Sequence, residues 1–259
     1  MQNYIKSEAF RIAHSRGMYL LTAGVSAVIF CLHLLLFWLG KSSGGTYPYA
    51  TARFSLGMLV SSPMLYCYMA FLSAGIMFGE DRKNATVKQA VVCGVTGAGI
   101  FAGKCIVGTA AAACSLIAIM TVYVGSAWLL LPVDTMEIHA ILLQIPAMSL
   151  IAMAAMMLGI LVLDGFDKNV TGIAVWFLTV TILPRVLLCL ARGLQSELLC
   201  RAALLLPGNF LTQEVRVTLS GYELLWNTPQ GMAKCLLTGA AGLLVVAAAG
   251  IYTYENKEF

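Results

Sequence analysis

The sequence predicts an all-α, polytopic membrane protein with six transmembrane helices. Of its 259 residues, 60% are hydrophobic and only 11% are charged, whereas soluble domains carry about 25% charged residues. The mean hydropathy of +0.86 agrees with this composition. So few charges cannot cover the surface of a water-soluble fold of this size, which excludes the soluble enzyme and nucleic-acid-binding classes and places the chain in a lipid bilayer.

Six apolar stretches are long enough to cross a bilayer, which takes about 20 residues of helix. They are predicted at Met18–Leu39, Leu56–Phe78, Cys105–Leu131, Ala140–Leu163, Val170–Ala191 and Gly231–Tyr252. The third is long enough to tilt or to extend beyond the lipid. Pro184 and Arg185 predict a kink or an early end in the fifth. We expect a single transmembrane domain. Residues 18–78 hold the first two spans, residues 105–191 hold the next three, and residues 231–259 hold the sixth span and the tail.

The distribution of Lys and Arg orients these spans, because cytoplasmic loops collect basic residues, most clearly where the loops are short. If the termini are cytoplasmic, the short outside segment 132–139 contains no Lys or Arg but contains Asp134 and Glu137. The inside segments hold most of the basic residues, including Arg82 and Lys83. Both termini are therefore predicted to be cytoplasmic.

Residues 1–17 are predicted to form a helix that lies in the cytoplasmic interface. Its apolar side chains recur on one helical face: Ile5, Ala9, Ile12 and Ala13. Its charged or polar side chains lie largely elsewhere: Lys6, Glu8, Arg11 and His14. This pattern is typical of interfacial helices whose basic residues approach lipid phosphates. The alternative is an ordinary basic juxtamembrane segment.

Segment 79–104 is a polar island between the second and third spans, and it is predicted to be cytoplasmic. Residues 81–84 read as a polar turn. Apolar residues then recur at helical spacing, at Val87, Ala90, Val91 and Val95, and Thr86 can cap such a helix. Four glycines follow, which allow a bend or a close approach of another helix. We expect a short helix lying flat beneath the spans; the alternative is a long loop.

Two glycine patterns in this island resemble nucleotide sites without their context. Residues 98–105 lack the first glycine of a phosphate-binding loop, and Cys105 stands where Ser or Thr would bind magnesium. Residues 97–102 fit GxGxxA, but no predicted strand precedes them. The three histidines have no metal-ligand spacing. No cofactor is therefore expected in this chain.

The island resembles the cytoplasmic loop of type-2 ABC exporter permeases. The residues that stand in similar places are Phe78, Glu80, Thr86, Val95, Thr96 and Lys104. Two positions depart from the family pattern, because Ala85 replaces a glycine and Gly97 stands where arginine is usual. The sequence is short and contains no expected ATPase segment. In this respect it most resembles the permeases of bacteriocin, lantibiotic or bacitracin-type export and immunity systems.

The resemblance implies a permease subunit of the bacterial plasma membrane that exports an apolar or amphipathic cargo, such as a peptide antibiotic or a drug. It implies a coupling helix between spans two and three, and a second permease chain, identical or different. A separate ATPase subunit would bind ATP and magnesium, so this chain would not itself be an enzyme. The residues implied to contact that ATPase are Glu80, Thr86, Val87, Val91, Val95 and Lys104.

Three polar residues within the apolar runs are candidates for a substrate path: His33, Gln144 and Arg185. Each can instead bond to a neighbouring helix or extend to the interface. Segment 192–230 is predicted to be extracellular, and re-entrant or interfacial, because its apolar stretch is too short to cross.

Other function classes remain as alternatives. A secondary transporter would show inverted repeats or intramembrane acids, and neither stands out. An intramembrane enzyme would need a nucleophile with a base, or paired acids, at membrane depth. A scaffold or sensor with the same fold is the third alternative.

Overall fold

The computed structural model is a helical bundle, and it describes residues 2–45, 47–81, 86–131, 135–166, 168–217 and 222–256. Within these residues, five helices are long and apolar enough to cross a membrane. They are α2 (Arg16–Ser42), α6 (Gly97–Leu130), α7 (Thr135–Gly165), the continuous helix Asn169–Gly193, and α12 (Pro229–Glu255). A bent pair, α3 (Ala52–Val60) with α4 (Leu65–Phe78), makes six if it counts as one span.

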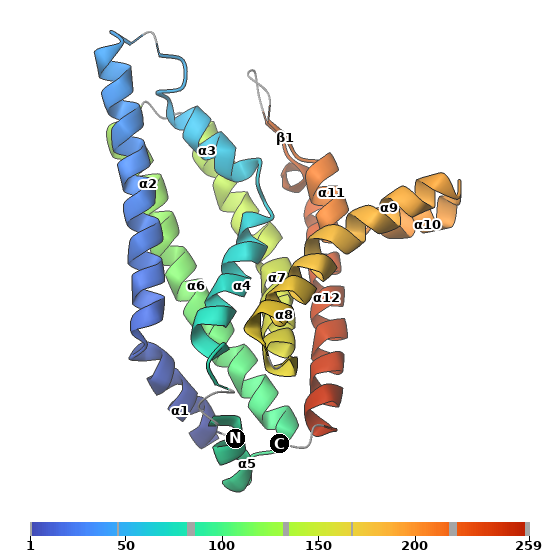
Figure 1. Ribbon diagram of the computed structural model, residues 1–259. Helices are drawn as coiled ribbons and strands as arrows, with labels where there is room; N and C mark the ends of the chain where they lie inside the picture. The colour runs from blue at the N-terminus through green and yellow to red at the C-terminus, as the bar shows by residue number, and fades with distance from the viewer. Residues whose placement is uncertain are drawn as a thin grey trace.

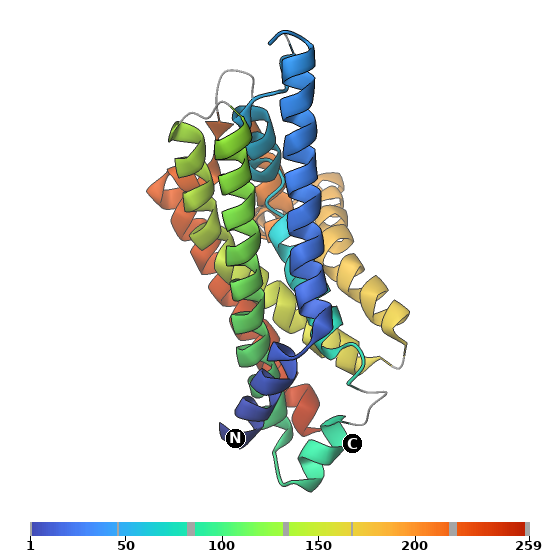
Figure 2. The ribbon, with the colours of Figure 1, turned by 90° about the vertical axis from the view of Figure 1, so that its left-hand side faces the viewer.

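Helices α2, α6, α7 and α12 run roughly side by side, whereas α9 (Leu183–Gly193) points outward from the bundle, and both ends of the chain lie at the same end (Figure 1). Helix α7 packs against α4, α8 and α12, whereas α2 packs mainly on α6 and stands at the edge of the bundle. Figure 2 shows two short helices, α1 (Gln2–Ala13) and α5 (Thr86–Val92), together beyond the long helices at this end. We call this end the terminal end.

The predicted second span is a pair of helices with a bend between them. Helices α3 and α4 meet at an angle of 70°, with a break at residues 61–64. Pro63 lies in this break, and proline has no N–H to continue the helical hydrogen bonds. Helix α3 also begins earlier than predicted, because the hydroxyl of Thr51 accepts a hydrogen bond from the backbone N–H of Phe54 at 3.3 Å.

The fifth apolar stretch does not end at Pro184. Helix α8 (Asn169–Phe177) passes through a π-helical turn, η1 (Leu178–Ile182), into α9 (Leu183–Gly193). A π-helical turn is one way in which a helix accommodates a residue that cannot donate a backbone hydrogen bond. Pro184 comes directly after the π-helical turn, inside this continuous helix, where it cannot donate a backbone hydrogen bond to the preceding turn.

Segment 192–230 folds into short elements, none of which is long enough to span. Helix α10 (Glu197–Leu204) packs against α9, and α11 (Pro207–Gln213) follows. Strands β1 (Arg216–Val217) and β2 (Tyr222–Glu223) pair antiparallel, and a 3₁₀ turn, η2 (Leu225–Asn227), leads into α12. The buried indole of Trp226 donates to the carbonyl of Ala140 at 3.2 Å and so fastens this segment to α7.

Aromatic packing fixes the middle of the bundle. The ring of Trp176 stacks on that of Phe71 with centroids 4.2 Å apart. Its indole N–H donates to the carbonyl of Ala155 at 2.9 Å. One side chain of α8 therefore joins α4 to α7, and the polar atom that it buries is paired.

Helix α1 confirms the predicted N-terminal helix. On its apolar face Ile12 is buried, whereas Ala9 and Ala13 are exposed. Glu8 is also buried. The charges of α1 are therefore partly directed into the protein, where other charged groups meet them.

The predicted loop 79–104 ends earlier than expected, because α6 begins at Gly97. The hydroxyl of Thr96 caps this helix by accepting from the backbone N–H of Gly99 at 3.2 Å. A Cβ atom at Gly97 would lie 2.2 Å from the carbonyl oxygen of Tyr254. The absence of a side chain at this position therefore permits the end of α12 to reach the start of α6.

A glycine-to-alanine comparison tests this close approach. Gly97→Ala should lower the melting temperature of the purified protein, because the new methyl group overlaps a backbone carbonyl. Gly125→Ala is the matched control on the same helix, since nothing lies within 4 Å of its Cβ position, and alanine is favoured over glycine by about 1 kcal/mol in a helix. Equal melting temperatures for the two variants would contradict the predicted contact.

Candidate functional site

The short helix predicted in the island is present as α5. It ends at Val92 and is followed by Gly94, whose φ of +82° lies in the left-handed region. The N–H of Val95 donates to the carbonyl of Ala90 at 3.1 Å, and that of Gly94 to Val91 at 2.9 Å. These two bonds form a Schellman motif, which ends the helix and turns the chain towards α6.

The two sides of α5 differ in burial. Val87, Ala90 and Val95 pack against the hydrophobic cluster at the terminal end, as predicted. Val91 is 38% exposed and Val92 is 88% exposed, so the predicted burial of Val91 is only partial. Glu80, at the other end of the loop, is also exposed. The predicted turn after Asp81 and the side chain of Thr86 lie outside the described residues.

At the terminal end, the side chain of Lys104 is fully buried between two aspartates. Its ammonium lies 2.8 Å from a carboxylate oxygen of Asp81 and 2.6 Å from one of Asp164. Asp81 follows α4, Lys104 lies in α6 and Asp164 lies near the end of α7. The ion pair of Asp81 with Lys104 therefore joins the two ends of the loop that carries α5.

Two further helices contribute to this cluster. The guanidinium of Arg11 in α1 pairs with Asp81, and it also binds Glu8 at 2.6 Å. The phenol of Tyr254 in α12 donates to Asp164. We use the name terminal charge cluster for these six residues: Glu8, Arg11, Asp81, Lys104, Asp164 and Tyr254.

An aromatic ring supports both cations of the cluster. The ammonium of Lys104 lies 5.3 Å from the ring centroid of Phe78, and the guanidinium carbon of Arg11 lies 5.6 Å from it. Both distances are within the range of cation–π attraction. Phe78 is the last residue of α4, so the cluster is also anchored to the second span.

Outside the spans, Arg11 of the cluster and the neighbouring Tyr4, both in α1, show how the charges affect each other's pKa. Partial burial disfavours the charge of Arg11, but Asp81 and Glu8 together outweigh that effect and raise the pKa of Arg11. Burial, together with the charge and hydrogen bond of Glu8, raises the pKa of Tyr4 above its ordinary value. The guanidinium therefore stays charged and the phenol neutral.

This arrangement changes the role expected for Lys104. A fully buried side chain does not reach a partner protein, so the expected direct contact of Lys104 with an ATPase does not fit the structure. The groups that Lys104 contacts are Asp81 and Asp164. Sequence reasoning missed Glu8, Arg11, Asp81, Asp164 and Tyr254 as members of a site. The one available signal was a lysine at the start of a span with aspartates flanking other spans.

His33 lies far from this cluster and bonds to two neighbouring helices. Its Nδ1 lies 2.6 Å from the hydroxyl of Ser126 in α6, and its Nε2 lies 2.6 Å from the hydroxyl of Ser55 in α3. Both ring nitrogens of this buried side chain are thus paired. In this structure His33 joins α2 to the bundle.

Gln144 is buried beside the break between α3 and α4. Its amide nitrogen lies 3.4 Å from the carbonyl oxygen of Val60 and 3.5 Å from that of Leu59. These carbonyls belong to the last turn of α3, where helical N–H partners run out. The carbonyl of Leu59 also accepts from the N–H of Ser62 at 3.1 Å. Gln144 therefore adds a donor to the carbonyls at the break between α3 and α4.

Arg185 is exposed on α9, on the part of the fifth span beyond the π-helical turn. The structure does not bring His33, Gln144 and Arg185 together, because they lie on α2, α7 and α9 and have separate neighbours.

No protein-family model matches this chain, and searches of curated proteins and of solved structures also found no match. Among the described residues, no group of three or more His, Cys, Asp or Glu side chains has an arrangement suited to a metal ion. The functional argument therefore depends on the fold and on the terminal charge cluster.

Removing the buried cation should strongly destabilise the protein. Lys104→Met leaves Asp81 and Asp164 without their shared cation, which costs about 3–5 kcal/mol when a buried ion pair loses one partner. Thermal or denaturant unfolding of the detergent-solubilised protein measures this loss.

Lys234→Met is the matched control, because Lys234 pairs with Glu214 at a partly exposed position. Such pairs contribute at most about 1 kcal/mol. If Lys104→Met is no more destabilising than this control, Lys104 is not held by a buried ion pair.

Proposed function

We propose that this chain is the membrane-spanning permease subunit of an ABC exporter in a bacterial plasma membrane. The observation that carries the proposal is the α5 loop, which presents Val91 and Val92 outward while the pair of Asp81 and Lys104 joins its two ends. Helix α5, held at both ends of its loop, suits a coupling element, because a displacement of α5 is transmitted to the spans.

The proposed topology counts the bent pair α3–α4 as one of six spans and places both termini in the cytoplasm. Both termini at the same end of the bundle agree with an even number of spans (Figure 1). The excess of Lys and Arg predicted on that side supports its cytoplasmic orientation. Helix α1 then lies at the cytoplasmic interface, with the exposed Phe10 available to the lipid boundary.

The proposed partner is a separate ATPase subunit that binds ATP and magnesium. A short helix with an apolar tip suits a groove on such a partner. Val91 and Val92 are the residues that we expect to enter this groove, and the exposed Glu80 is the expected polar contact beside it. Two permease chains, identical or different, would share an ATPase pair.

The proposed mechanism transmits motion through the terminal charge cluster. Closure of the ATPase pair displaces α5, and the ion pairs of Lys104 pass that displacement to α4 and α7. Arg11 passes it to α1, and Tyr254 passes it to α12. Because a buried ion pair resists separation, the helices move as rigid bodies between inward and outward states. The proposed cargo is apolar or amphipathic, in keeping with walls of hydrocarbon side chains.

A secondary transporter is the second candidate function, and the buried aspartates favour it. Asp81 and Asp164 at the end of the spans are acidic groups of the kind that ion-coupled transporters use. The two functions differ in their energy source. Transport that requires ATP and persists when ion gradients are collapsed supports the exporter, and the opposite result supports the secondary transporter.

Alanine substitution of the exposed tip of α5 tests the exporter proposal. The wild-type chain, tagged and purified from its native membrane, should co-purify with a protein that has ABC ATPase motifs and vanadate-sensitive ATPase activity. The double variant Val91→Ala/Val92→Ala should bind it at least tenfold more weakly, since each lost CH₂ of buried contact is worth about 0.8 kcal/mol.

Leu198→Ala is the control, because Leu198 is 81% exposed on α10, remote from α5 in Figure 1. It should leave the complex intact. Neither α5 position is deeply buried, so the double variant should keep the wild-type melting temperature. Absence of any ABC ATPase from the wild-type preparation, or unchanged affinity in the double variant, would overturn the proposal.

A further inference from the structure

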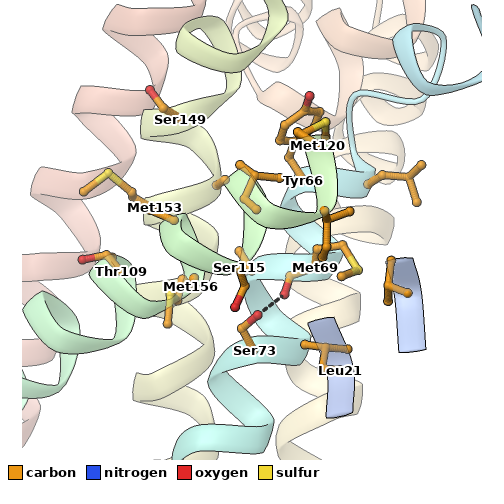
Figure 3. Close-up of a pocket in the computed structure, with 18 of the residues that line it drawn as sticks. Leu21, Tyr66, Met69, Ser73, Thr109, Ser115, Met120, Ser149, Met153 and Met156 are labelled. Carbon is orange, nitrogen blue, oxygen red and sulfur yellow. Dashed lines mark hydrogen bonds between the residues drawn. The ribbon is translucent and has the colours of Figure 1, made fainter. Parts of the chain in front are cut away.

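A cavity of about 540 Å³ lies between α2, α3–α4, α6 and α7 (Figure 3). This volume falls in the range of about 300–1,000 Å³ that is usual for ligand sites. Leu21 of α2 faces it from one side, and Met69, Met153 and Met156 face it from α4 and α7. The cavity lies among the membrane-length helices, farther from the termini than the terminal charge cluster.

The lining is apolar in its chemistry. Among the described residues that line the cavity, none carries a charged side chain. Three of its hydroxyls donate within their own helices: Ser73 to the carbonyl of Met69 at 2.9 Å, Thr109 to that of Cys105 at 2.7 Å, and Ser149 to that of Pro146 at 2.8 Å. An ion would lose its hydration here without a charged side chain to compensate.

The cavity is elongated along the helices. Its lining on α6 runs from Thr109 to Tyr123, about 21 Å at the 1.5 Å rise per residue of an α-helix. Its lining on α2 runs from Leu21 to Ile29, about 12 Å on the same rise. Methionine side chains along the walls can adapt to a flexible occupant, because they are unbranched and polarizable.

Polar bonds hold the α2 wall in place beside and beyond the cavity. The hydroxyl of Thr22 donates to that of Ser115 at 3.0 Å, next to Leu21. Beyond Ile29, His33 bonds to Ser126 and Ser55. The cavity is therefore preformed, and α2 at the edge of the bundle is its outer wall (Figure 1).

We propose that this cavity binds one long alkyl chain, aligned with the helices, with the polar head of the molecule left outside. An apolar, elongated site without charged groups matches a hydrocarbon chain in both shape and chemistry. In a bilayer the gain comes from close packing more than from leaving water. The bound alkyl chain can belong to a bilayer lipid or to a lipid-tailed cargo. The proposal goes beyond the exporter function and does not depend on it.

Photolabelling in lipid nanodiscs tests the proposal. The probe is a long-chain fatty acid with a photoactivatable diazirine near the end of its chain, and mass spectrometry locates the labelled residues. The label should fall on lining residues such as Met69, Met153 and Met156. Ala113→Phe places a ring in the cavity and should reduce this labelling at least fivefold.

Ala118→Phe is the matched control, because Ala118 is exposed on the same helix but does not line the cavity. It should leave the labelling unchanged. If Ala113→Phe fails to fold, Ala110→Phe makes the same test from a neighbouring lining position. Melting temperatures separate loss of the site from loss of the fold.

Competition in detergent micelles, where no bilayer lipid is present, identifies the source of the alkyl chain. Displacement of the probe by added phospholipid assigns the site to bilayer lipid, and displacement only by a single-chain alkyl amphiphile assigns it to a tailed cargo; both results support the site. Label confined to outward residues such as Leu20 and Val28, or equal labelling in the wild type and both cavity variants, would overturn it. Neither of these results would alter the ATPase co-purification, so the two proposals fail separately.

Discussion

The ammonium of Lys104, enclosed by Asp81 and Asp164, is the interaction on which the terminal end of the bundle depends. A buried charge is tolerated only while its partners stay in place, so this lysine fixes the positions of both aspartates. Each aspartate then holds another helix, since Asp81 binds Arg11 of α1 and Asp164 binds Tyr254 of α12. One buried cation thus sets the arrangement of α1, α4, α6, α7 and α12.

This ion-pair constraint also couples the α5 loop to the spans. The loop would otherwise be a flexible connection, because its helix is only two turns long and too short to be stable alone. Joining its two ends through Asp81 and Lys104 ties any displacement of α5 to the spans. The elongated cavity lies among the same helices, α4, α6 and α7. The site proposed for an alkyl chain and the proposed docking helix are therefore connected through shared helices.

Periodicity and composition predicted the long helices and the short helices α1 and α5, because hydrophobic patterns are local features of the sequence. Local patterns could not show how distant residues meet. Glu8, Asp81 and Asp164 each look like a solvated charge near a helix end, and only tertiary packing brings them to Arg11 and Lys104. The break beside Pro63 was missed because the apolar run continues through it, and Gln144 adds a donor to the carbonyls there from another helix. The glycine at position 97 is explained only by tertiary packing, because a Cβ atom there would lie 2.2 Å from the carbonyl oxygen of Tyr254.

Hydrogen–deuterium exchange of the wild type and Lys104→Met tests the central claim most directly, since it reports local opening along the whole chain. If Lys104 holds the terminal end together, the variant should exchange faster in α1, in α5 and in the last turns of α12. Exchange in α10 and α11, which are remote from the cluster, should remain as in the wild type. Faster exchange limited to the turns of α6 around Lys104, with α1 and α5 unchanged, would contradict the account.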